Sequence, residues 1–130
     1  MYRPKFVQVS HDISVSVKPM YLEEESNPLI SKHVFAYFIT IENIADQKVQ
    51  LLKRHWQIHD SSGKDHQIEG EGVVGKQPMI EPGSNHQYNS FCVLDSYQGS
   101  MSGYYIMERA DGEEISVQVP EFILVSHLLN

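Results

Sequence analysis

The sequence predicts an all-β fold, a β-sandwich of about seven antiparallel strands, and three observations indicate it. Apolar and polar residues alternate with period two along most of the chain, as in half-buried strands. No stretch of about eleven or more residues carries apolar side chains at helical spacing. Turn signals separate the apolar runs, and one long run is apolar in both phases, which favours a sandwich over a barrel.

The first two predicted strands lie in residues 13–21 and 33–44. Apolar residues from Ile13 to Val17 alternate with serines, so this strand is expected to bury one face. A charged loop with a turn signal follows at residues 23–28. The second run is apolar in both phases, which is typical of a central strand covered on both sides.

Residues 49–60 form the third predicted strand, with Leu52, Trp56 and Ile58 on one face. Arg54 shares the phase of Trp56. We expect it to cap the sheet edge in a structural role, and the alternative is that it contacts a protein partner.

A turn at Asp60 is predicted to fold the next segment back as a hairpin. Aspartate first and glycine fourth are typical of a type I turn, and a glycine bulge would then place Asp60 opposite Lys64. The same register sets Trp56 opposite Ile68, with both expected on the buried face. It also sets Gly70 diagonal to Trp56, where the missing side chain would leave room for the indole.

Two further turn signals organise the C-terminal half. A proline–glycine type II turn at residues 81–84 leads into a strand at residues 85–94. Asp111 and Gly112 indicate a two-residue hairpin turn, and Pro120 is expected to end its second strand. That turn would pair Arg109 with Glu114, Ile106 with Val117, and Tyr104 with Val119.

This hairpin also supplies two candidate contact residues. In the predicted register, Tyr105 and Met107 point away from the face that holds Tyr104 and Ile106. Exposed tyrosine and methionine are enriched at protein interfaces, so both are candidates for binding a partner. The alternative is that both faces of the hairpin are buried.

The glycine string that begins at Gly70 is the one segment with the spacing of a phosphate-binding motif. Gly70, Gly72 and Gly75 form a G-x-G-x-x-G pattern, and Lys76 follows it. The dinucleotide fingerprint needs a helix opening directly after the glycines, but no helical spacing follows here and Pro78 interrupts the segment. We therefore favour a glycine-kinked strand or bulge; an anion-binding loop of backbone amides with Lys76 is the alternative.

Composition limits the protein's setting and partners. The chain has 130 residues, which predicts one domain spanning 1–130. Its 17 acidic and 10 basic residues give a net charge of −7, which argues against nonspecific nucleic-acid or anionic-membrane binding. The single cysteine, Cys92, and the lack of a signal-like apolar start predict a soluble cytoplasmic protein.

Residues with catalytic or metal-binding chemistry show no convincing arrangement. His55 and His59 would lie about 13 Å apart along a strand, too far to share one metal ion. The acidic run at residues 23–25 is expected to be solvated. Cys92 lies in a predicted strand, where a buried and inert thiol is expected. We therefore predict no enzyme activity, no cofactor and no metal site.

The order and spacing of several blocks resemble the ApaG (CorD) family over nearly the whole chain. The blocks are residues 17–21, 50–56, 70–78, 82–83, 88–90, 99–104 and 119–122. The resemblance implies a fibronectin type III-like or immunoglobulin-like sandwich. It brings no catalytic residues, because none is established for the family.

The resemblance implies only a loosely defined role. Bacterial members are associated with tolerance of divalent cations, especially cobalt and magnesium, and related eukaryotic domains are inferred to bind proteins. We therefore expect a non-catalytic protein-binding module whose partner is unknown, and we leave a homo-oligomer open. The alternative is a sensor that binds a phosphorylated compound or a divalent cation at the Gly70–Lys76 loop.

Overall fold

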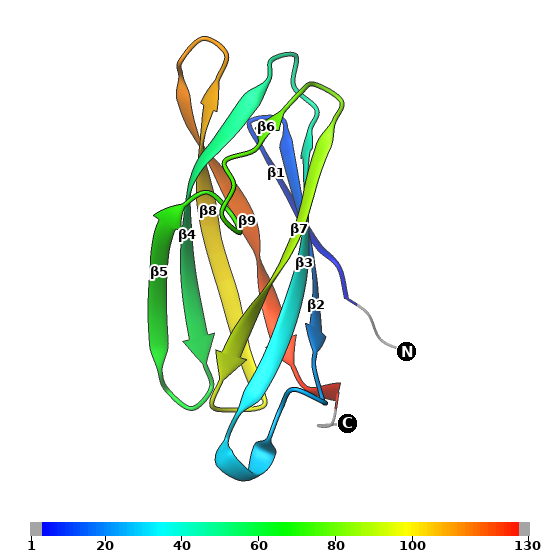
Figure 1. Cartoon of the computed structure of the whole chain (residues 1–130), viewed down its shortest axis with the longest axis vertical. Coiled ribbons are helices and arrows are strands. Elements are labelled where there is room, and N and C mark those ends of the chain that lie inside the picture. Colours follow the sequence, from blue (N-terminus) through cyan, green and yellow to red (C-terminus); the bar gives the residue numbers. More distant parts are fainter. Residues whose placement is uncertain (1–3, 128–130) are drawn as a thin grey trace.

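A computed structural model describes residues 4–127 and arranges them in two antiparallel sheets packed face to face (Figure 1). The strands are β1 (Phe6–Ser10), β2 (Ile13–Tyr21), β3 (His33–Asn43), β4 (Val49–Asp60), β5 (Asp65–Glu71), β6 (Met79–Ile80), β7 (Asn85–Leu94), β8 (Gln98–Arg109) and β9 (Glu114–Val125). A turn of 3-10 helix, η1 (Pro28–Ile30), lies between β2 and β3. No helix within residues 4–127 is long and apolar enough to cross a membrane.

The strand order is β1-β2-β3-β7 in the four-stranded sheet and β5-β4-β8-β9 in the five-stranded sheet, where β6 pairs with β4. The predicted all-β sandwich is confirmed. Two strands were not anticipated, β1 and the two-residue β6. The turn into β2 is made by His11 and Asp12, both with positive φ (51° and 60°), so it lacks the glycine that would have marked it.

Inward-facing side chains of both sheets form one hydrophobic core, because apolar residues alternate with polar ones along most strands. The largest side chains with almost no exposure are Tyr105, Phe35, Phe122, Ile13, Ile39, Ile41, Leu51, Ile80, Leu94, Met101, Met107 and Leu124. Leu51 is buried rather than Leu52, because a bulge between Leu51 and Lys53 shifts the phase of β4.

The β4–β5 hairpin has the predicted register. The Asp60 amide donates to Lys64 O at 2.9 Å, and Trp56 lies opposite Ile68. Burial differs from the expectation, because Trp56 is 3% exposed and Ile68 is 43% exposed. Ile68 therefore points inward at a place that the opposite sheet does not cover.

The glycine that makes room for the indole is Gly103, not Gly70. A Cβ at Gly103 would lie 3.1 Å from Cε3 of Trp56 and 2.0 Å from His55 O. A Cβ at Gly70 would instead lie 2.8 Å from a guanidinium nitrogen of Arg54. The predicted packing role of Gly70 was therefore assigned to the wrong neighbour.

The predicted register of the β8–β9 hairpin was wrong by one residue. The Gly112 amide donates to Arg109 O at 2.9 Å and the Arg109 amide to Glu113 O at 2.8 Å, the same turn geometry as at Asp60. Arg109 consequently forms its ion pair with Glu113, at 3.3 Å, rather than with Glu114. A slip of one residue exchanges the faces of a strand.

That exchange removes both candidate contact residues on β8. Tyr105 and Met107 are fully buried, whereas Tyr104 and Ile106 lie on the outer face. Met107 faces Ile115 and Tyr105 faces Val117 across the sheet. The prediction that these two side chains are exposed was wrong.

Pro120 does not end its strand, because β9 continues to Val125. The register of β8 with β9 shifts between Met101 and Gly103, which face Phe122 and Val119. Pro120 and Glu121 therefore have no paired residue on β8. A bulge on an edge strand tolerates a residue that lacks an N–H group.

Asp60 joins two loops at one end of the sandwich. Its carboxylate accepts hydrogen bonds from the Ser62 amide at 3.0 Å, the Ser96 hydroxyl at 2.6 Å and the Asp95 amide at 2.6 Å. Burial alone would raise the pKa of Asp60, but these hydrogen bonds outweigh it and lower the pKa to about 2. An ion pair of Lys64 with Asp95, at 2.6 Å, lies beside this contact.

Candidate functional site

The glycine string leaves β5 and makes a tight turn rather than a cradle. The amide of Val73 donates to Lys76 O at 2.8 Å, and the amide of Lys76 donates to Val73 O at 3.0 Å. Val74 and Gly75, between them, both have positive φ (48° and 75°), as in the mirror-image turns that join hairpin strands. Val73 is 1% exposed and belongs to the core, so this turn is anchored by its own side chain.

Gly72 is required by close packing of the backbone. It has φ +63°, and a Cβ there would lie 2.1 Å from Lys76 O. Its amide donates to Leu52 O at 2.8 Å, which ties the turn to β4. Gly75 has nothing within 4 Å of the corresponding position, so its need is conformational.

The backbone carbonyl groups at the start of this turn bind the side chain of Arg54. The guanidinium of Arg54 donates to Glu71 O at 3.1 Å and to Gly72 O at 2.9 Å. The amides of Gly72, Val73 and Lys76 already donate to backbone carbonyls. An anion-binding nest needs converging amides, and in this turn three of them are engaged elsewhere.

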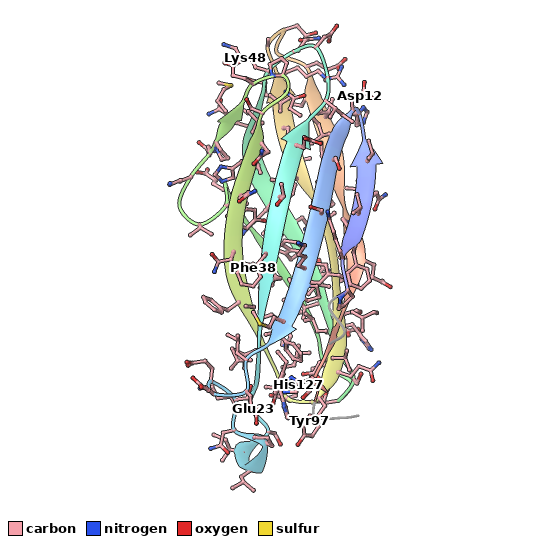
Figure 2. All side chains as sticks on the ribbon, turned by 90° about the vertical axis from the view of Figure 1, so that its right-hand side faces the viewer. Asp12, Glu23, Phe38, Lys48, Tyr97 and His127 are labelled. Atoms are coloured by element: carbon pink, nitrogen blue, oxygen red, sulfur yellow. The ribbon has the colours of Figure 1, made fainter. Side chains whose placement is uncertain are left out.

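Lys76 follows the turn and is exposed. Burial and, after it, the positive charge of Lys76 lower the pKa of His86 on β7. The glycine turn therefore lies near the start of β7, and Figure 2 shows it as the green loop beside the first half of that strand.

A cleft of about 330 Å³ opens beside this turn, on the outer face of the five-stranded sheet. His55 stacks on Tyr104 with ring centroids 4.9 Å apart and planes at 16°. Its Nδ1 lies 2.9 Å from Glu69 Oε1 across the strand pair. The residues that line the cleft are Lys53, Arg54, His55, Glu69, Gly70, Glu71, Tyr104 and Ile106. The cleft thus includes Gly70 and Arg54, but not Gly72, Gly75 or Lys76.

The histidines of β4 are each paired with a carboxylate on β5. His55 faces Glu69, and Nδ1 of His59 lies 2.6 Å from Asp65 Oδ1. The confirmed register also sets His66 opposite Ile58 rather than His59. No group of three or more metal-ligating side chains is found among residues 4–127.

Three tyrosine hydroxyl groups lie between the two sheets. Tyr88 of β7 and Tyr105 of β8 are hydrogen-bonded through their hydroxyl groups, and Tyr37 is hydrogen-bonded to Ser90. Burial, more than any other cause, raises the pKa of all three. Burial likewise raises the pKa of the Cys92 thiol to about 11, so the thiolate is scarce at neutral pH.

Sequence reasoning missed an exposed apolar patch on the outer face of the four-stranded sheet, which faces the viewer in Figure 2. Its members, here called the apolar patch, are Met20, Phe38, Phe91 and Val93, exposed by 36%, 43%, 60% and 56%. Ala36 lies directly between Met20 and Phe91 in the register. The apolar residues on the outer face of β3 could have indicated the patch, but they were interpreted as a face covered by other parts of the chain.

The two outer faces of the sandwich differ in charge. On β2, β3 and β7 of the four-stranded sheet, the outward positions carry Lys18 and Glu42 as their charged residues. The outward positions of β4 and β5 instead include Lys53, His55, His59, Asp65, Glu69 and Glu71. The apolar patch therefore lies on the face that is poor in charge.

Comparison with known proteins identifies close relatives. A family model described as the ApaG domain matches residues 23–109. Protein ApaG of Sinorhizobium fredii is 43% identical over 97% of this chain and 94% of its own length. Protein ApaG of Vibrio vulnificus is 45% identical over 91% of this chain and 94% of its own length. The crystal structure of a putative ApaA protein from Bordetella pertussis superposes with a TM-score of 0.87 at 37% identity, covering 89% of this chain and 94% of that one.

Proposed function

The chain belongs to the ApaG domain family, and from this premise we propose that it is a non-catalytic protein-binding module. The observation that carries the proposal is the apolar patch on the outer face of the four-stranded sheet. A contiguous exposed apolar patch on a folded protein is typical of an interaction surface. The module would act in the cytoplasm.

The breadth of the apolar patch supports a protein as the partner. Phe38 and Phe91 stand on neighbouring strands, with Ala36 and Asn89 beside them, so the patch is broad. Aromatic and methionine side chains with few charges around them are the composition of an interface core. Burial of this patch would remove little charge from water, which keeps the desolvation cost low.

The chemically active groups of the described chain are in states that do not favour catalysis. The Cys92 thiol has a pKa near 11, and the buried tyrosines have raised pKa values. The carboxylate of Asp60 is fully engaged by three donors from two loops. These groups serve the fold in our proposal.

Affinity capture from a lysate of the native cell tests the proposal. The bait is the full chain, compared with a Phe38→Glu/Phe91→Glu double variant and with Ile123→Glu/Val125→Glu as control. Ile123 and Val125 are 39% and 37% exposed on the other sheet, so the control adds the same charge outside the patch. We expect a protein that the wild type and the control retain and the double variant loses. Equal capture by all three baits would contradict the proposed surface.

A second candidate is a small-ligand sensor, which the cleft beside Gly70 favours. A phosphorylated compound or a divalent cation would be held near Gly70, Arg54 and Lys53. Thermal-shift measurements of wild type and Lys53→Ala with ATP, NAD, diadenosine tetraphosphate or cobalt test this function, because Lys53 lines the cleft. We expect no ligand-dependent shift. A nucleotide shift that Lys53→Ala abolishes would make ligand binding the leading function.

A further inference from the structure

Strand β7 forms an edge of the four-stranded sheet, and the second half of this edge is unprotected. It pairs with β3 from end to end without a register shift, and in the described part of the chain no strand pairs with its other side. Its residues, Asn85 to Leu94, include no charged residue and no proline. Natural edge strands are usually protected by charges, prolines, bulges or short length, because an open edge invites another strand.

The other described edge strands carry such protection. Strand β1 has only 5 residues, and β9 contains Pro120 at a bulge. Strand β5 carries Asp65, Glu69 and Glu71 among its 7 residues. The second half of β7 is thus a flat and uncharged open edge, whereas the glycine turn lies beside the first half, where Lys76 acts on His86 (Figure 2).

The inner face of β5 shows that a strand position beside β7 is empty. Ile68 shares the inward face of Trp56, yet it is 43% exposed, whereas Trp56 is 3% exposed. Strands β1 and β2 both contact β9, so the four-stranded sheet is displaced towards that side and ends before it covers β5. In Figure 1, β5 stands at the left margin with no strand of the other sheet over it. A strand added to β7 would lie over Ile68.

We propose that β7 binds an extended segment of a partner protein as an additional strand of the four-stranded sheet. Backbone groups in the second half of β7 would pair with the segment, as in other cases of strand addition. One set of alternate side chains would pack beside Phe91 and Val93, and the other set would cover Ile68. The segment therefore has apolar residues at alternating positions and no proline at its centre. This inference rests on the proposed function and names the kind of partner.

A second copy of the chain fits this edge poorly. In an antiparallel pairing of two β7 strands centred on Asn89, Phe91 would face Gln87 and Val93 would face Asn85. Registers that set Phe91 against Val93 overlap only over the last half of the strand. Each copy also carries a net charge of −7, which opposes self-association. The same charge favours a partner segment that is neutral or basic.

Selection from a displayed library of random linear peptides, about twelve residues long, tests the inference on the full chain. We expect enriched peptides with alternating apolar residues. Binding should fall by about tenfold or more in both Phe91→Lys and Ile68→Lys. Val7→Lys, at a residue 53% exposed on the far edge of the same sheet, and Ile123→Lys are matched controls that should bind normally. Bound peptide should also slow hydrogen exchange of β7 amides.

Several results would overturn the inference. They are the absence of enriched peptides, peptide binding that Ile68→Lys leaves unchanged, and unchanged hydrogen exchange in β7. A dimer in sedimentation that Phe91→Lys dissociates would assign the edge to a second copy instead. If peptide selection fails while lysate capture still depends on Phe38 and Phe91, the protein-binding function stands and strand addition falls.

Discussion

Gly72 and Gly75 both have a positive φ, but only Gly72 is closely packed against other backbone atoms. Gly72→Ala would push a methyl group to 2.1 Å from Lys76 O, whereas the site at Gly75 is open within 4 Å. We predict that Gly75→Ala lowers the free energy of unfolding by about 1 kcal/mol, from backbone strain alone. Gly72→Ala should cost at least about 1 kcal/mol more than that.

Chemical denaturation of both glycine variants checks this difference, with Lys76→Ala as the control. Lys76 is exposed, so its variant should stay within about 0.5 kcal/mol of the wild type. Equal losses at Gly72 and Gly75 would contradict the close approach of Lys76 O.

Trp56 and Ile68 lie opposite each other on β4 and β5 but differ in burial. Trp56→Ala is predicted to destabilise the protein by about 3–5 kcal/mol, because it leaves a large cavity against Tyr37 and Phe122. Ile68→Ala should cost less than about 1.5 kcal/mol, because nearly half of that side chain already contacts water. Denaturant midpoints of both variants, followed by circular dichroism, measure the contrast, and the emission of the wild type reports on Trp56, the single tryptophan of the sequence. A red-shifted emission in the wild type would contradict the burial of Trp56.

At the scale of elements, the carboxylate of Asp60 holds the β4–β5 turn to the β7–β8 loop. Its pKa is about 2 in the folded chain, against an ordinary value of 3.8. Ionised Asp60 therefore stabilises the fold above pH 4, and this contribution disappears as the pH falls towards 2. The difference corresponds to roughly 2 kcal/mol.

Asp60→Asn is predicted to lose stability at neutral pH and to flatten the acid limb of the stability curve. Urea titrations of wild type and variant between neutral pH and pH 2 measure this, and the two curves should converge at the acid end. Ser61→Ala is a suitable control, because the Ser61 contact shown with Gln98 O is made by its backbone amide at 3.0 Å. A variant that keeps the full acid dependence would assign it to another carboxylate.

The two hairpins show how far sequence reasoning reaches at this scale. At Asp60, turn chemistry predicted the register, and the structure confirms it. At Asp111, the Asp-Gly pair favoured a shorter turn than the one formed, so the predicted register was wrong. Residues 104–107 could not correct the register, because they are apolar or aromatic on both faces of the strand. Alternation predicted the strands, but it could not reveal that the opposite sheet stops short of Ile68.

The apolar patch escaped prediction for a related reason. Its four members come from β2, β3 and β7, so they meet only after the strands pair. In the sequence, β3 looks like a strand covered on both sides, because Val34, Ala36 and Phe38 on its outer face are all apolar. In the structure Val34 and Ala36 are buried, but Phe38 is exposed. Alternation in the sequence shows which residues share a face of one strand. Which of the two faces is covered depends on the strands and loops that pack against it.

For the whole molecule, the buried tyrosines predict an alkaline limit to stability. Burial raises the pKa of Tyr37, Tyr88 and Tyr105 above the ordinary value of 10.0. The unfolded chain therefore ionises first as the pH rises above 10, and stability is lost from that point upward. Tyrosinate absorbance should rise in two stages, the second coinciding with loss of the native circular dichroism signal. A single early stage, with the fold intact, would contradict the burial of these hydroxyl groups.

The shared turn geometry at Asp60 and Arg109 has a consequence for engineering. The first turn is fastened to a neighbouring loop by Asp60, Ser61 and Lys64, so a longer loop there would break those contacts. The second turn, residues 110–112, is exposed throughout, and a Cβ at Gly112 would meet nothing within 4 Å. An epitope tag or a fluorescent reporter is therefore best inserted at residues 110–112, where the chain can lengthen without disturbing either sheet.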